Sequence, residues 1–84
     1  MDQEQEQERI FDINVTENGR MYSGWVNPSI ETNESGLPAS YHVVLDNVSF
    51  GHVSFKDCRW MVNEERPAAL TAAIGRAIEQ HYEL

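Results

Sequence analysis

The chain has 84 residues, which fits one domain, and it carries 14 acidic against 6 basic residues, for a net charge of −8. This balance disfavours binding to nucleic-acid backbones or anionic lipid surfaces, because both need clustered Lys and Arg, so we expect no nucleic-acid and no membrane partner. A single cysteine, Cys58, excludes an intrachain disulfide and a four-cysteine zinc site.

The start of the chain predicts a tail followed by one domain. Residues 1–8 alternate Gln and Glu with no apolar residue after Met1, so we expect a disordered tail. Residues 9–84 carry the apolar patterns of a single folded domain. The segment MDQEQEQERIFD lacks the basic start and apolar run of a signal peptide, and no run of about eighteen apolar residues follows, so we expect a cytoplasmic protein.

The first two strands are predicted to form a hairpin. Apolar and polar residues alternate from Arg9 to Thr16, and Asn18-Gly19 then supplies the two residues of a type I′ turn. Directly opposed residues share a sheet face. This turn places on the core face Phe11, Ile13, Val15, Tyr22, Gly24 and Val26. Gly24 has no side chain and leaves room for another backbone to approach the strand closely, and we expect this to be the backbone of the helix.

A loop is expected after this hairpin. Residues 27–39, NPSIETNESGLPA, are rich in the residue types that favour turns and irregular structure. The segment holds no aromatic, Cys, His or Lys residue that would carry chemistry. We therefore interpret it as mobile rather than functional.

A second hairpin and a last strand are expected next. Residues 40–45 and 48–55 flank Asp46-Asn47, and a tight turn near Lys56-Asp57 leads to a strand over 58–62. In this register Trp60 lies opposite Val53, and the two histidines of the hairpin, His42 and His52, fall on opposite faces.

The second hairpin contains a break in its pattern. Val53 and Phe55 have the opposite parity from Val48 and Phe50. Either a β-bulge at Gly51-His52 returns all four to the core face, or the strand is apolar on both sides. We favour the bulge, because bulges commonly fall at glycine.

The end of the chain predicts a helix over about 67–82. Its apolar residues recur at helical spacing, Pro67 suits the first position, and Gly75 indicates a close contact between helix and sheet. The predicted fold is therefore α+β, an antiparallel β-meander of four to five strands with one C-terminal α-helix packed on one sheet face.

The sequence contains no motif that fixes a nucleophile, a metal or a phosphate, so we expect no catalytic residue, no cofactor and no metal site. The histidines His42, His52 and His81 have no recognised ligand spacing. Cys58 has a base nearby in His52 but no orienting third group, so an enzyme built on these two residues is a weaker alternative.

An exposed apolar surface is the better functional prediction. The helix covers one sheet face, and contiguous apolar residues on the other face would mark an interface. The candidate interface residues are Met21, Trp25, Val53, Phe55 and Trp60.

Several segments resemble small stand-alone bacterial proteins of uncharacterised function. The shared features are the turn after the first strand, the segment YHVVLDNVSFGHV, a late strand with a Trp, and the helix segment AAIGRAIEQHY. The resemblance covers about residues 10–84 and brings no catalytic residues with it. It implies this fold and a bacterial cytoplasmic setting.

We expect a non-enzymatic interaction module or homodimer that binds itself or another protein through the uncovered sheet face. The alternative is a small-ligand-binding domain with a cavity between helix and sheet and the 27–39 loop at its mouth. An acidic mimic of nucleic acid is less favoured, because four of the carboxylates lie in residues 1–8 rather than along one surface.

Overall fold

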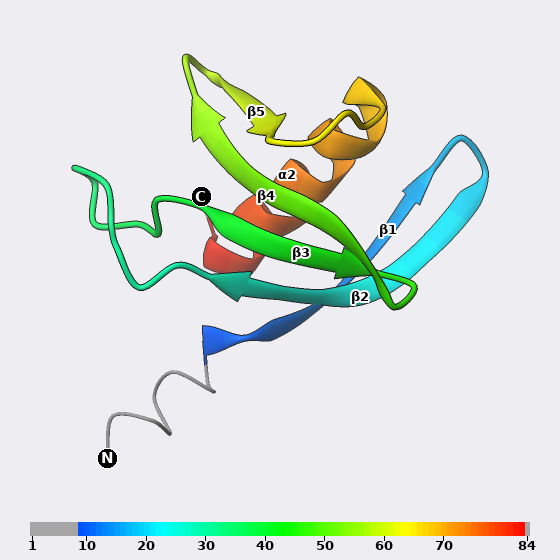
Figure 1. Ribbon diagram of the computed structural model, residues 1–84, viewed down its shortest axis with the longest axis horizontal. Helices are drawn as coiled ribbons and strands as arrows, with labels where there is room; N and C mark the ends of the chain where they lie inside the picture. Colours follow the sequence, from blue (N-terminus) through cyan, green and yellow to red (C-terminus); the bar gives the residue numbers. More distant parts are fainter. Residues whose placement is uncertain (1–8, 84) are drawn as a thin grey trace.

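The computed structural model describes residues 9–83 and confirms the α+β fold (Figure 1). One antiparallel sheet holds five strands in sequence order. They are β1 (Phe11–Glu17), β2 (Arg20–Pro28), β3 (Tyr41–Leu45), β4 (Val48–Lys56) and β5 (Arg59–Val62), followed by helix α2 (Ala68–Tyr82). The predicted tail over residues 1–8 lies outside the described residues.

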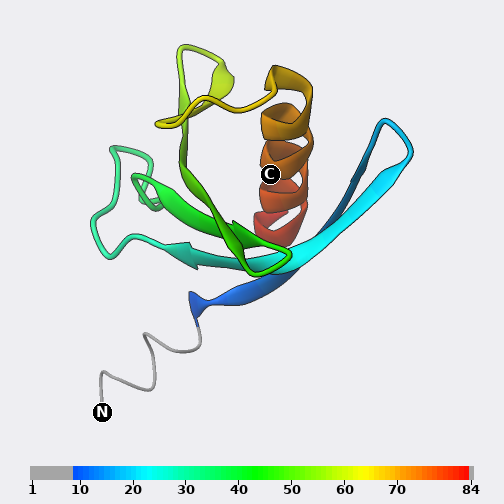
Figure 2. The same cartoon turned by 45° about the vertical axis from the view of Figure 1, so that its right-hand side comes forward.

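The sheet curls around the helix instead of lying flat beneath it. Helix α2 contacts β1 at one edge of the sheet and β4 and β5 at the other. Figure 2 shows the helix inside the curve, with the β1–β2 hairpin on one side and the β4–β5 hairpin on the other. The core fills this space; its fully buried side chains are Val26, Val43, Val53, Ile74 and Ile78.

Three two-residue turns set the strand pairing. Asn18-Gly19, Asp46-Asn47 and Asp57-Cys58 all have positive φ at both positions, as type I′ hairpins require. The register of the first hairpin is confirmed at every predicted pair. The third turn lies one residue later than expected, because Lys56 pairs with Arg59.

The bulge in β4 is confirmed, one residue earlier than predicted. Val43 pairs with Gly51 and Val44 with Ser49, which leaves Phe50 as the extra residue. Gly51 has a φ of 128°, a conformation that favours glycine. Phe50 and Val53 consequently both face the core and are buried. Val48 and Phe55, which the bulge was also expected to return to the core face, are 67% and 53% exposed.

Two glycines allow close approaches, only one of them to the helix. A Cβ atom on Gly75 would overlap the ring of Trp60, which confirms the predicted contact between helix and sheet. A Cβ atom on Gly24 would instead overlap the carbonyl of Val44 on β3. The expectation that the helix approaches Gly24 is therefore wrong.

Candidate functional site

Cavities lie near both ends of the helix, and one of the two near its C-terminus is lined by Arg9, His81 and Tyr82. The other C-terminal cavity, about 400 Å³, lies between α2, the β4–β5 hairpin and the segment that joins β2 to β3. We name this the aromatic pocket, and it is lined by Asn33, Ser35, Leu37, Pro38, Ala39, Tyr41, Phe55, Trp60 and Glu79. Near the helix N-terminus, about 250 Å³ forms another cavity, which we name the arginine cleft.

Trp60 is the central wall of the aromatic pocket. It comes from β5 and packs its ring on Gly75 of the helix, where any larger residue would collide with it. Its ring centroid lies 5.7 Å from that of Tyr41 and 5.4 Å from that of Phe55, both in tilted arrangements. Strands β3, β4 and β5 thus each supply one aromatic ring to the same wall.

A carboxylate completes this wall. The indole nitrogen Nε1 of Trp60 donates a hydrogen bond to Oε2 of Glu79, 2.9 Å away. Glu79 is partly buried on the helix. Among residues 9–83 the one ion pair joins Arg20 to Asp46, so no described basic side chain neutralises Glu79. The pocket therefore contains a negative charge beside aromatic rings.

The connection between β2 and β3 closes the pocket on its outer side. Its residues bond to one another: Oδ1 of Asn33 accepts hydrogen bonds from the amides of Ser35 and Leu37, at 2.8 and 3.1 Å. Thr32 and Pro38 form an isolated β-bridge, and β2 extends to Pro28, so the predicted 27–39 loop is partly an extension of the hairpin. The segment lines the pocket despite its lack of reactive side chains.

Tyr41 is the most buried of the three aromatic residues that line the aromatic pocket. Its side chain is only 3% exposed, although it also lines the cavity. Burial, and secondarily the nearby Tyr82, raises the pKa of Tyr41 to about 12. The phenol therefore stays neutral at physiological pH, and it offers the pocket a ring face and an uncharged hydroxyl.

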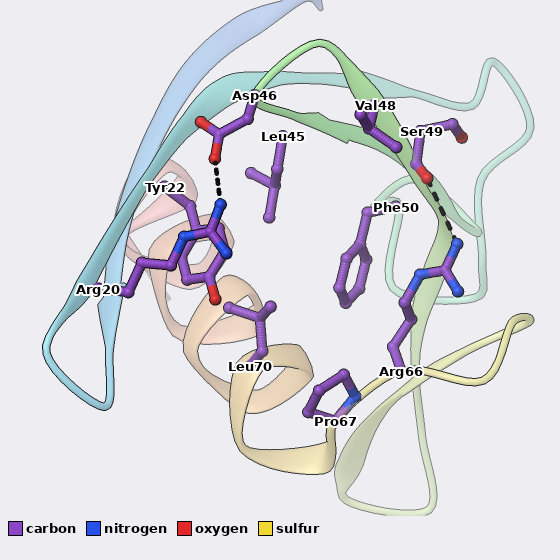
Figure 3. Close-up of a pocket in the computed structure, with 10 residues that line it drawn as sticks. All are labelled: Arg20, Tyr22, Leu45, Asp46, Val48, Ser49, Phe50, Arg66, Pro67 and Leu70. Atoms are coloured by element: carbon purple, nitrogen blue, oxygen red, sulfur yellow. Dashed lines mark hydrogen bonds and ion pairs between the residues drawn. The ribbon is translucent and has the colours of Figure 1, made fainter.

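The arginine cleft has a different chemistry. Arg20 pairs with Asp46 at 3.3 Å and stacks over the ring of Tyr22, and Arg66 donates to the carbonyl of Ser49 at 3.4 Å. Figure 3 shows the two guanidinium groups on opposite sides of the opening, with apolar side chains between them. The residues that line it are Arg20, Tyr22, Leu45, Asp46, Val48, Ser49, Phe50, Arg66, Pro67 and Leu70.

The outer sheet face carries a pair of histidines. His42 and His52 are directly opposed, and their rings stack at a centroid distance of 4.7 Å. The prediction that they fall on opposite faces is wrong, because the bulge shifts the register of β4. Burial, and secondarily His52, lowers the pKa of His42. Trp25 packs edge-on against His42.

The structure divides the five candidate interface residues between two surfaces. Met21 and Trp25 lie on the outer face, 71% and 37% exposed. Ser23 lies between them and bonds through its hydroxyl to Asn14 at 2.8 Å, so a polar pair interrupts the apolar surface.

The other three candidates lie on the helix side of the sheet. Val53 is 0% exposed, so its assignment to an interface is wrong. Phe55 is 53% exposed but belongs to the aromatic pocket, as does Trp60. Trp60 pairs with Phe55 rather than with Val53, since the third turn is one residue later than expected. Its assignment to the uncovered face is also wrong.

The remaining reactive side chains are dispersed. Cys58 is exposed in the last turn, and no group of three or more His, Cys, Asp or Glu residues within 9–83 is arranged to hold a metal ion. None of the three histidines lines the aromatic pocket. In the part of the chain that the structure describes, no helix has the length and apolar character needed to cross a membrane.

Comparisons with protein-family models, with curated proteins and with solved structures find no match to this chain.

The sequence named Phe55 and Trp60 as interface candidates, and its ligand-binding alternative put the 27–39 loop at the mouth of a cavity, but Tyr41 and Glu79 were not among the candidate residues. One signal was available for Glu79: it follows Gly75 by four residues and so lies on the same helix face. A large side chain packed on Gly75 would therefore meet Glu79 next.

Proposed function

We propose that this protein is a small-ligand-binding domain whose site is the aromatic pocket. The observation that carries the proposal is a cavity of about 400 Å³ lined by Tyr41, Phe55 and Trp60 and covered by the β2–β3 connection. Ligand sites are typically concave, mostly apolar cavities of about 300–1,000 Å³ with a few polar groups. At about 30 Å³ per atom, this one holds roughly ten to fifteen non-hydrogen atoms.

A binding role is favoured over a catalytic one by the placement of the reactive groups. Cys58 and the histidines do not line the pocket, and Glu79 is the one carboxylate among its lining residues. A side-chain nucleophile needs an activating base within hydrogen-bond reach, and the lining residues include a carboxylate but neither Cys nor His. This composition favours recognition over nucleophilic catalysis.

The same geometry favours ligand binding over an interface on the outer face. An interface would need a contiguous apolar patch, whereas the exposed residues Met21 and Trp25 are separated by the bonded pair of Ser23 and Asn14. The aromatic side chains that the sequence suggested for an interface line the pocket instead.

Fluorescence titration tests the proposal. The full-length Trp25→Phe variant leaves Trp60 as the sole tryptophan, so its emission reports on the pocket. Benzyl alcohol, benzyltrimethylammonium and benzoate are neutral, cationic and anionic probes of similar size. We expect a saturable change in emission with at least one probe, and its loss when Ala39→Phe fills the pocket.

Thr16→Phe, which adds the same ring to an exposed position on β1, is the matched control and should not affect binding. If none of the probes produces a saturable change, or if the response survives Ala39→Phe, the pocket is not a ligand site.

A further inference from the structure

The carboxylate of Glu79 lies where the helix dipole disfavours a negative charge. Glu79 lies in the last turn of α2, where the helix macrodipole is negative and favours basic residues. No described basic side chain pairs with it. Its one described bond, to the indole of Trp60, engages Oε2 and leaves Oε1 for another partner.

Aromatic side chains share the cavity with this charge. Trp60, Tyr41 and Phe55 line the same cavity as Glu79, and the face of an aromatic ring attracts cations through its quadrupole, with Trp the strongest. The net charge of the chain, −8, adds a long-range attraction for cations and a repulsion for anions. The local and the overall charge therefore favour the same sign of ligand.

We propose that the ligand of the aromatic pocket is an organic cation, an amine or a quaternary ammonium compound. Its positive group contacts Glu79 and the ring of Trp60, and its apolar part fills the space beneath the β2–β3 connection. This inference rests on the proposed function, because it names the class of ligand for the same pocket.

The arginine cleft supplies an internal contrast. Arg20 and Arg66 both lie at its opening, and Asp46 neutralises only Arg20, so the net charge at this opening is positive and favours an organic anion over a cation (Figure 3). A cation is instead favoured in the aromatic pocket, where the charged lining residue is Glu79. The two cavities thus differ in the sign of ligand that they accept.

A matched pair of probes isolates the charge. Choline and 3,3-dimethylbutan-1-ol have nearly the same shape, and only choline is positively charged. Affinities are measured by the Trp60 emission of the Trp25→Phe protein and checked by NMR titration. We expect choline to bind about tenfold more tightly than the neutral alcohol, within the range of a cation beside an aromatic ring and a carboxylate.

Glu79→Gln removes the charge and keeps an oxygen that accepts the indole hydrogen bond of Trp60. We expect this variant to lose most of the preference for choline and to bind 3,3-dimethylbutan-1-ol unchanged. Glu83→Gln removes a neighbouring charge that does not line the pocket, and it should leave both affinities unchanged. Unchanged circular dichroism confirms that each variant is folded.

The outcomes separate the two proposals. If both probes bind equally, or if Glu79→Gln has no effect on the preference, the pocket binds ligands but the assignment to cations is wrong. If the two probes and the three benzyl compounds all fail to bind, the proposed function is wrong and this inference is overturned with it.

Discussion

Gly75→Ala is the sharpest test of how the pocket is built. In an ordinary helix interior, replacing Gly by Ala raises the free energy of unfolding by about 1 kcal/mol. Here the new methyl group would lie 2.6 Å from Cδ2 of Trp60 and would overlap other atoms of that ring. The indole must move, and it is the group that bonds to Glu79.

The magnitude follows from competing effects. Overpacking costs about 1–3 kcal/mol. Losing a hydrogen bond to a charged acceptor costs about 1.5–3 kcal/mol, and the lower value applies here because Glu79 is partly exposed. The helix preference of Ala over Gly offsets about 1 kcal/mol of these costs. We therefore expect Gly75→Ala to lower the free energy of unfolding by about 2 kcal/mol. For a domain of this size the melting temperature falls by about 10 °C.

The assay is urea denaturation followed by far-ultraviolet circular dichroism, which does not depend on the emission of Trp60. The decisive control repeats the change in a Trp60→Ala background. With the ring absent, Gly75→Ala should become stabilising by about 1 kcal/mol, so the sign reverses. The reasoning is refuted if Gly75→Ala stabilises the native protein, or if it costs the same with and without the ring.

Four further predictions test separate parts of the structure. Burial raises the pKa of Tyr41 from 10.0 to about 12, so the folded state retains the proton to higher pH than the unfolded state does. The contribution to stability is full below pH 10 and is lost, by up to about 3 kcal/mol, as the pH rises through 12. Tyr41→Phe should flatten this loss in urea titrations at pH 9 and 11, and an unchanged slope would contradict it. Burial lowers the pKa of His42 below 6.5, so on acidification the unfolded state takes up the proton before the folded state does. The free energy of unfolding therefore falls as the pH drops through 6.5. His42→Gln should reduce this loss of stability, measured by thermal melts at pH 7 and pH 5. Cys58 has a φ of 66°, a conformation that glycine adopts more readily than residues with a side chain. Cys58→Gly should therefore raise the free energy of unfolding in chemical denaturation by up to about 1 kcal/mol, whereas Cys58→Ala should not raise it. Light scattering should give a monomer whose mass does not change in Trp25→Ser; a dimer that this change dissociates would restore the outer-face interface.

The first hairpin was fully predictable because one local signal determines its geometry. Asn18-Gly19 accepts positive φ at both turn positions, and a two-residue turn fixes every pair that follows. The helix was predictable for a similar reason, since Leu70, Ile74 and Ile78 recur at helical spacing and are all buried. In both elements, short-range pattern and tertiary packing agree.

The second half of the sheet was less predictable because single-residue shifts reverse faces. The extra residue at Phe50 restores Val53 to the core and brings His42 opposite His52. The turn at Asp57-Cys58, displaced by one residue, gives Trp60 a different partner. Alternation within a strand has a period of two, so each shift changes the surface on which a side chain lies. The sequence indicated both the bulge and the turn, but it placed each of them one residue away from its position in the structure.

The pocket depends on these two shifts together with the absence of a side chain at Gly75. The bulge in β4 makes Val53 part of the core, and the displaced turn sets Trp60 beside Phe55 on the inner side. Gly75 then lets the indole reach the helix and bond to Glu79. That arrangement costs stability twice, through glycine in a helix interior and through a carboxylate at the negative end of the helix dipole. The contact between Gly75 and the ring of Trp60 offsets the first cost, and the indole hydrogen bond to Glu79 offsets the second. The cationic ligand that we propose would offset the second cost further.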